Sequence, residues 1–126
     1  MPLIQVARDR IAGLIMGAET CHWGDAKATI WVASSTAVHS PTSTWLGSAG
    51  VASTMEAGYP SRTLNVLQFR GIYSTAQANF QWEQWLIHTA TATNAGVPLN
   101  IAPAQLLGTK TSAASWQLTA CITITT

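Results

Sequence analysis

The clearest pattern along the chain is an alternation near the C-terminus, where apolar and polar residues take turns from Trp116 to Thr125. A period of two is typical of a β-strand that buries one face and exposes the other. The pattern therefore predicts a final strand with a threonine-covered outer face and a buried apolar face. The predicted buried residues are Trp116, Leu118, Ala120, Ile122 and Ile124.

A different period, of three and four residues, predicts a helix over residues 2–17. Pro2 suits the first helical position, and Gly17 suits the position just after the last turn. An apolar stripe along such a helix has to lie against the sheet of the same domain or against a neighbouring subunit. The stripe consists of Leu3, Ile4, Ala7, Ile11, Leu14 and Ile15.

Shorter apolar runs between these two elements are rich in β-branched and aromatic residues and predict strands over 27–33, 64–74 and 80–89. In the second of these, Leu67 and Phe69 share one predicted face. Several short strands that follow one helix indicate a mainly β protein. The predicted architecture is an antiparallel β-sandwich with one N-terminal α-helix.

Clusters of Ser, Thr, Gly and Pro predict loops over 34–50 and 94–98, then a weak strand and a turn over 107–114. None of these segments separates two apolar cores. We therefore expect a single domain over 1–126, with the sandwich beginning at about residue 27.

The composition changes this picture because charge is scarce. Six Lys or Arg and five Asp or Glu make 9% of the 126 residues charged, whereas an ordinary soluble domain has about 25%. Hydrophobic residues make up 48% of the chain, and six of them are tryptophans. With so few charges, much of the surface of a free monomer would be uncharged. We therefore expect other subunits to cover part of that surface.

The same numbers exclude several classes of function. A net charge of +1 is too small for the positive field that binding to nucleic acids or to anionic membranes requires. No apolar run approaches the roughly 20 residues that span a bilayer. The N-terminus is not built like a signal peptide, because Arg8, Asp9 and Arg10 interrupt it. Cys21 and Cys121 are therefore expected to be free thiols in a reducing cytoplasm.

Candidate catalytic residues are sparse. The chain has no GxSxG, GxxxxGK[ST], HExxH or GxGxxG motif. Its five carboxylates are widely spread, so a glycosidase-like pair could arise only through folding. We expect no catalytic residues, no enzyme activity and no cofactor.

The histidines form no metal-binding pattern. Cys21 and His22 are adjacent, and adjacent residues rarely both reach one tetrahedral metal ion. We expect no metal, and we expect His22 to lie at the surface or in an interface. His88 follows an apolar pair at the end of a predicted strand and is expected at the rim.

The tryptophans point to an interface. Trp116 belongs to the predicted core, but Trp82 and Trp85 are three apart in one predicted strand and should point to opposite faces. Trp23 and Trp45 occur in predicted loops, where tryptophan often anchors a protein–protein contact. A carbohydrate platform is the alternative, although hydroxyl-binding Asp, Asn or Arg residues are sparse around both. The predicted interface residues are Trp23, Trp45, Trp85, Arg8 and Arg10.

Several segments resemble a family of small virion proteins of tailed bacteriophages. The resemblance rests on NVLQFR at 65–70, ANFQWEQW at 78–85, LGTKTS at 107–112 with SWQLT at 115–119, RDRIAGLI at 8–15 and Gly-Tyr-Pro at 58–60. It covers most of the chain and is most specific in the second half. Family members often have Glu-Trp-Gly-Ile-Phe where this chain has Gln-Trp-Leu-Ile-His at 84–88.

The resemblance implies a structural role in the virion, without catalysis. A fibre needs a stalk and a distal tip, and 126 residues beginning at Met1 leave little length for them. We therefore expect a capsid decoration (cement) protein, a homotrimer that binds the major capsid protein after assembly in the host bacterial cytoplasm. A tail, collar, neck or baseplate component is the first alternative, and a carbohydrate-binding module for host attachment is the second.

Overall fold

The fold comes from a computed structural model, which describes residues 3–17, 23, 28–40, 42–43, 45–46, 50–89 and 97–124, the side chain of Leu14 excepted. Cys21, His22 and most of the predicted loop at 94–98 lie outside the described residues. The elements are α1 (Gln5–Ile15), β1 (Thr29–Ala33), β2 (Val51–Thr54), β3 (Ser61–Thr63), β4 (Val66–Tyr73), β5 (Gln81–Trp82), β6 (Gln84–His88), β7 (Asn100–Ile101), β8 (Gly108–Thr109) and β9 (Trp116–Thr123).

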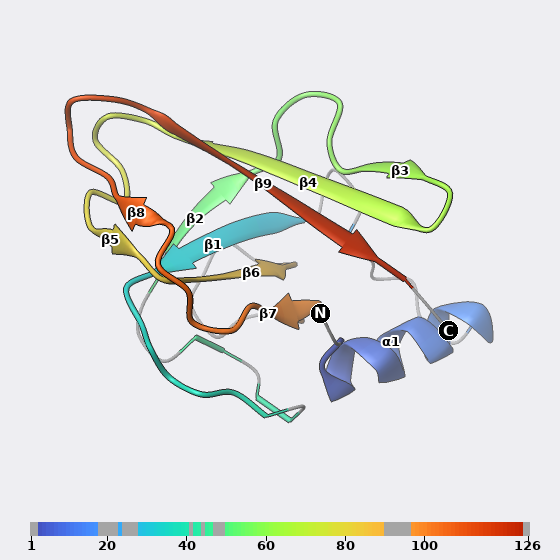
Figure 1. The fold of residues 1–126 in the computed structure, drawn as a ribbon. Helices are drawn as coiled ribbons and strands as arrows, with labels where there is room; N and C mark the ends of the chain where they lie inside the picture. The colour runs from blue at the N-terminus through green and yellow to red at the C-terminus, as the bar shows by residue number, and fades with distance from the viewer. Residues whose placement is uncertain are drawn as a thin grey trace.

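The described strands form three antiparallel groups (Figure 1). One sheet has the order β2-β1-β6-β7, a second has the order β3-β4-β9, and β5 pairs with β8. The longest pairing joins β4 and β9 over eight residues, from Val66 opposite Thr123 to Tyr73 opposite Trp116. The prediction of a mainly β protein with antiparallel sheets and one N-terminal helix is confirmed.

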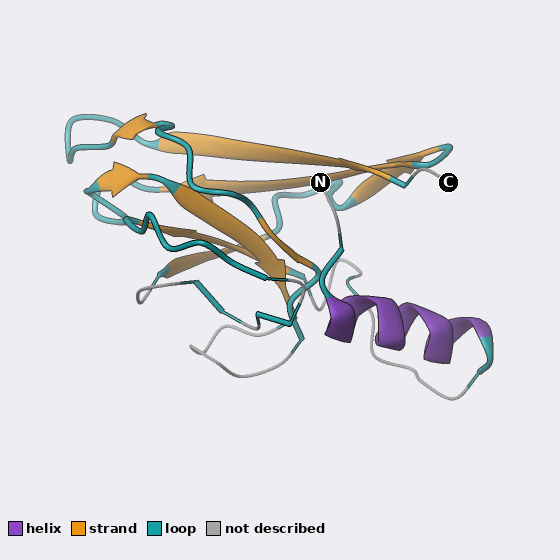
Figure 2. Ribbon diagram, turned by 60° about the horizontal axis from the view of Figure 1, so that its bottom comes forward, coloured by secondary structure: helices purple, strands orange, loops and turns teal. Residues whose placement is uncertain are grey.

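The sheet of β3, β4 and β9 lies over the sheet that contains β1 and β6 (Figure 2). The sheets lie close together at Gly71, where an added Cβ would collide with Cγ2 of Ile30 and lie 3.0 Å from Cβ of Ser53. Beside it, the Tyr73 hydroxyl donates a hydrogen bond to the Ile30 carbonyl at 2.7 Å. Glycine at position 71 therefore lets the two sheets approach each other.

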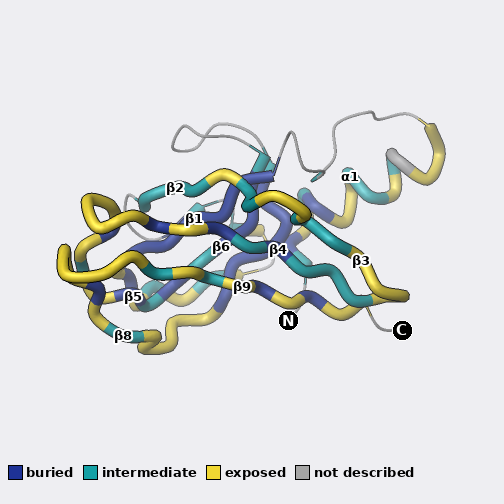
Figure 3. The backbone as a smooth tube through the Cα atoms, turned by 90° about the horizontal axis from the view of Figure 1, so that it is seen from above, coloured by how far each residue is buried: buried dark blue, intermediate teal, exposed yellow. Residues whose placement is uncertain are grey.

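Buried residues run along β1 and β6 (Figure 3), and the core also includes residues of β4 and β9. All five residues of β1 are buried, so this strand has no solvent face. Burial raises the pKa of Tyr73 well above its ordinary value. The core side chains contributed by β1, β4, β6 and β9 include Ile30, Trp31, Val32, Phe69, Tyr73, Leu86, Ile87, Ala120 and Ile122.

A bulge interrupts the predicted strand over 80–89. Glu83 donates its backbone N–H to the Ala33 carbonyl, although the residue that pairs with Ala33 is Gln84. Two residues thus oppose one, which is the geometry of a β-bulge. The extra residue places Trp82 on the same side as Trp85, so the prediction that the two point to opposite faces is wrong.

The helix is shorter than predicted, and its stripe is covered along part of its length. Ile4 and Ala7 are buried, and Gly17 has the positive φ of 72° expected after a helix end. Ile15 and Met16, in contrast, are 79% and 81% exposed. The domain therefore covers the beginning of the stripe and leaves its end in solvent.

The final strand confirms the predicted alternation from Trp116 to Thr123, where the inner residues are buried or half-buried and the outer residues are exposed. Ile124, predicted in the core, follows the strand and is 49% exposed. The predicted strand over 64–74 begins at Val66, because Leu64 lies in a turn with a φ of 55°. A residue with positive φ cannot continue a strand.

Candidate functional site

The most distinctive surface is the outer edge of β9. Ile124 donates its N–H to the Asn65 carbonyl, which identifies this opposed pair as hydrogen-bonded. Because hydrogen-bonded and non-bonded pairs alternate in an antiparallel ladder, Ile122, Ala120 and Leu118 also bond toward β4. The residues between them direct their backbone N–H and C=O groups away from the sheet. These residues are Gln117, Thr119, Cys121 and Thr123.

No described backbone group bonds to this edge. The strand contains no charged residue and no proline, the two features that usually protect an exposed edge. Its four outward-directed side chains are all exposed, and the Cys121 thiol among them is free, as predicted. β9 thus has the chemistry of a strand that accepts another strand.

Apolar side chains adjoin the open edge on its inner side. Trp85 and Leu118 are half-buried although both pack against the core. Nearby, the chain beside β5 and β6 bulges between Ala102 and Leu107, and a hollow of about 360 Å³ lies between this bulge and Trp85. Leu106 is 63% exposed. Leu118 on β9 and Trp85 on β6 are therefore only partly covered by the described residues.

The outer face of the β3-β4-β9 sheet carries a polar cluster that satisfies itself. The Arg70 guanidinium lies 3.8 Å from Glu56, donates to the Thr119 hydroxyl at 3.1 Å and stacks 4.4 Å above the Tyr59 ring. Gln117 also approaches Glu56, at 3.3 Å. Because these groups interact with one another, they are not free to bind a ligand.

A second apolar region lies at the end of the molecule where α1 and the β3–β4 turn both project (Figures 1 and 3). A groove of about 350 Å³ there is lined by Leu3 and Ile11 on the helix side and by Leu67 and Phe69 on the sheet side. Leu64, at the tip of the β3–β4 turn, is 82% exposed. The end of the helix stripe, Ile15 and Met16, is exposed at the same end of the chain fold.

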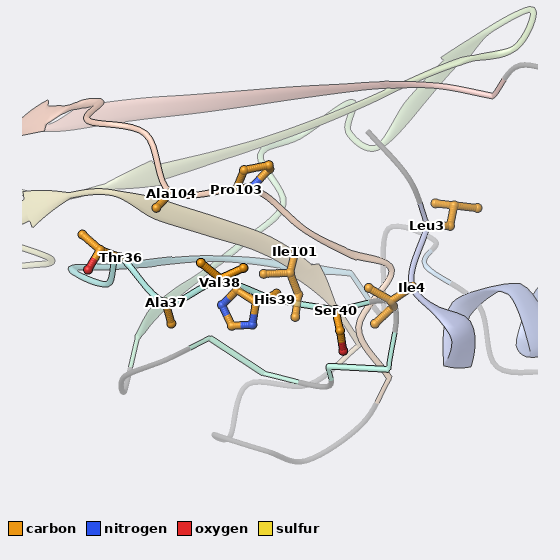
Figure 4. Close-up of a pocket in the computed structure, with 10 residues that line it drawn as sticks. All are labelled: Leu3, Ile4, Thr36, Ala37, Val38, His39, Ser40, Ile101, Pro103 and Ala104. Atoms are coloured by element: carbon orange, nitrogen blue, oxygen red, sulfur yellow. The ribbon is translucent and has the colours of Figure 1, made fainter.

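A third hollow, of about 370 Å³, lies where the segment before α1 meets the loop after β1 and the chain after β7 (Figure 4). Its walls are largely apolar, including Ile4, Ile101 and Pro103. The His39 ring reaches Gln84 at 3.3 Å, and Gln84 donates to the Ala37 carbonyl at 2.7 Å. These bonds attach the loop to the buried Gln84 and leave little polar chemistry for a ligand.

His88 is 1% exposed, so the prediction of a rim position is wrong. Trp45, from the predicted loop, packs edge-on against both His88 and Trp31, with ring centroids 5.0 and 4.8 Å apart. Its loop thereby covers the far face of β1 and β6. Burial lowers the pKa of His88 to about 4, so the imidazole is neutral at pH 7.

The structure brings the five predicted interface residues to different places. Trp45 covers β1, Trp85 is half-buried on β6, and Trp23 is partly buried with its indole N–H bonded to the Val97 carbonyl at 3.0 Å. Arg8 is exposed on α1 and donates to Gln5 at 2.9 Å, while Arg10 is half-buried. They form no single patch: Trp23 lines the groove beside α1, and Trp85 lines the hollow beside residues 102–107.

Sequence reasoning missed several structural residues. Lys110 is 1% exposed, and its ammonium donates to Asn79 at 2.7 Å, which ties the turn after β4 to the segment after β8. Gly71 and Gln84 likewise act through contacts distant in sequence. A lysine, a glycine or a glutamine in a polar-looking stretch carries no local signal for such a role.

Within the described residues, no three His, Cys, Asp or Glu side chains gather as a metal site would require. In the same part of the chain, no helix is long and apolar enough to cross a membrane. Comparisons with protein-family models, with curated proteins and with solved structures find no match to this chain.

Proposed function

We propose that this chain is a non-enzymatic structural protein of a tailed-bacteriophage virion, and that it acts as a homo-oligomeric decoration protein of the head. In this proposal it binds copies of itself and the major capsid protein, after synthesis in the bacterial cytoplasm. The two packed sheets then form a β-sandwich that is open along the β9 edge. The protein stabilises the shell by burying apolar surface between neighbouring subunits.

The observation that carries this proposal is the exposure of large apolar side chains on a chain with few charges. Val38 is 98% exposed, and Leu64, Met16 and Ile15 are all close to 80% exposed. Single exposed hydrophobic residues are ordinary, but a contiguous apolar groove with exposed residues around it is typical of an interaction site. The groove between α1 and the β3–β4 turn, with Leu64, Ile15 and Met16 at the same end, fits contact with the shell.

The tail, collar, neck or baseplate role remains the alternative within the virion. A carbohydrate-binding role receives less support, because Trp45 packs on Trp31 and His88 and serves to hold its loop on the sheet. The polar groups around Arg70 are likewise occupied by one another.

Immunogold electron microscopy of purified virions tests the proposal. An antibody raised against the recombinant chain should label the whole head surface. Label confined to the tail or to one vertex would replace decoration with the tail alternative. Intact and disrupted virions that both fail to label, in a lysate that contains the chain, would overturn the virion role.

Two variants and a control test this end of the molecule as the shell contact. Leu64→Ser and Met16→Ser should weaken binding of the purified chain to heads stripped of it, because both lose apolar contact area. Thr63→Ser changes the neighbouring exposed residue, at the end of β3, and should bind like the wild type. Equal binding by all three variants would exclude this end of the molecule as the contact.

A further inference from the structure

We infer that the open edge of β9 pairs with β9 of a second copy of this chain, antiparallel and about a two-fold axis at Ala120. The inference goes beyond the proposed function, since such a dimer forms in solution whether or not the protein binds a phage head. It also replaces the expected trimer with a two-fold pair as the unit that assembles.

The hydrogen-bonding groups of the edge define the register. Thr119 and Cys121 both direct their backbone groups outward, and so do Gln117 and Thr123. In an antiparallel pair centred on Ala120, Thr119 of one copy faces Cys121 of the other, and Gln117 faces Thr123. Each facing pair then exchanges two backbone hydrogen bonds, so every outward group within these residues finds a partner.

The side chains are compatible with the same register. Ala120, the smallest residue of the strand, meets its own copy at the axis, where two large side chains would collide. On the inner face, Leu118 comes beside Ile122 of the second copy, which extends the apolar layer. On the outer face, uncharged side chains meet one another, so no like charges oppose association.

The partly covered core beside β9 explains why a second copy fits better than an unrelated extended peptide. A stable protein–protein contact buries about 800 Å² on each partner, more than one strand edge supplies. A whole second domain brings further surface to the strand and also covers Leu118, which is half-buried on its inner face. The pairing then joins the two three-stranded sheets into one continuous sheet.

Disulfide trapping tests the register directly. In a Cys21→Ser background, Thr119→Cys places a thiol opposite the native Cys121 of the second copy, at the Cα separation of about 5.5 Å that disulfides favour. Mild oxidation should link two chains, and mass spectrometry should find a peptide joining positions 119 and 121. The matched control, Gln117→Cys in the same background, lies on the same exposed face two residues out of register and should link far less.

A second variant tests the edge without new thiols. Cys121→Pro removes an outward N–H that makes no bond within the monomer, and edge strands tolerate proline at such positions. Sedimentation velocity should give a wild-type mass of about twice 13.4 kDa and a largely monomeric variant with an unchanged circular dichroism spectrum. If this variant does not fold, the disulfide comparison decides the question.

Three results would overturn the inference. The first is a wild-type chain that stays monomeric at the highest soluble concentration. The second is a trimer, which this two-fold pairing cannot produce. The third is a dimer in which Thr119→Cys links no better than Gln117→Cys. A monomer would also remove self-association from the proposed function, but head labelling tests the virion role separately and can succeed where the β9 pairing fails.

Discussion

The two edges of the β3-β4-β9 sheet differ sharply. On the β4 side, β3 pairs with residues 66–68, the Arg70 carbonyl accepts the Glu56 N–H at 2.8 Å, and the Ile72 carbonyl accepts the Ser53 hydroxyl at 3.0 Å. On the β9 side, no described backbone group bonds to the outward positions. The chain that leaves β2 closes the first edge, while nothing in the described part of the chain closes the second.

The packing behind the two edges follows the same division. Near the closed edge, Gly71 lies against Ile30 and Ser53, so the sheets are in tight contact. Near the open edge, Leu118 is half-buried. One edge of this sheet is therefore closed by the chain itself, whereas the other keeps unpaired backbone groups and a partly exposed apolar side chain.

The largest expected effect compares two tryptophans that lie three residues apart. Trp82 is 2% exposed, contacts the Tyr73 and Trp116 rings and donates its indole N–H to the Ala78 carbonyl. Trp82→Ala should lower the free energy of unfolding by about 4 kcal/mol. Trp85→Ala, at a half-buried position of β6, should cost about half as much in urea denaturation of dilute protein. Equal losses would contradict the packing difference.

Gly71→Ala tests the closed edge. The added methyl would meet Ile30 at a distance that real Cβ atoms do not adopt, and overpacking of this kind costs about 1–3 kcal/mol. We expect a loss of stability near the upper end of this range. The molecules that fold should have the same oligomeric state as the wild type. Ile72→Ala is the control, because its side chain is 46% exposed and should cost less than about 1 kcal/mol. If the Gly71→Ala variant were as stable as the wild type, the two sheets would have to lie further apart at Gly71 than described above.

Acid should lower the free energy of unfolding through His88, which lies away from both edges of the β3-β4-β9 sheet. His88 has a pKa of about 4 in the folded chain, against an ordinary value of 6.5. Between these two pH values the unfolded chain binds a proton at this residue and the folded chain does not. Stability is complete above about pH 6.5 and falls as the pH drops toward 4. At about pH 5 the loss should be about 2 kcal/mol.

Denaturation curves at pH 7 and pH 5 check this expectation. In His88→Phe the difference between the two pH values should shrink by about 2 kcal/mol. An unchanged difference in His88→Phe would show that another group titrates.

The smallest effect on stability is expected at an exposed leucine between β7 and β8. Leu106 is 63% exposed, so Leu106→Ser should change the free energy of unfolding of the monomer by less than about 0.5 kcal/mol. If the second copy also covers this side chain, the variant should self-associate more weakly than the wild type. A variant that associates as strongly as the wild type would remove Leu106 from the proposed contact.

Local sequence patterns predicted the elements that have one face covered by the core and the other face exposed to solvent. The alternation from Trp116 to Thr123 identified β9, and the three- and four-residue spacing identified α1, because each has one covered face. The polar stretch that forms β2 and β3 gave no such signal. Those strands are half-exposed and are held by pairing with β1 and β4.

The remaining errors arise from tertiary contacts. The bulge at Glu83 depends on pairing with Ala33, distant in sequence, and it reverses the facing of Trp82. His88 is buried because the loop that carries Trp45 covers it. The open edge of β9 could not be predicted either, since the alternation of one strand does not show which of its sides is paired.

Amide hydrogen exchange along β9 tests the open edge and its pairing, because alternate N–H groups of this strand point outward. In dilute protein the outward N–H groups of Thr119 and Cys121 should exchange quickly, while the inward groups of Ala120 and Ile122 should exchange slowly. At high concentration all four should exchange slowly, since a second copy accepts the outward groups. Rapid exchange of Thr119 and Cys121 at every concentration would contradict this pairing.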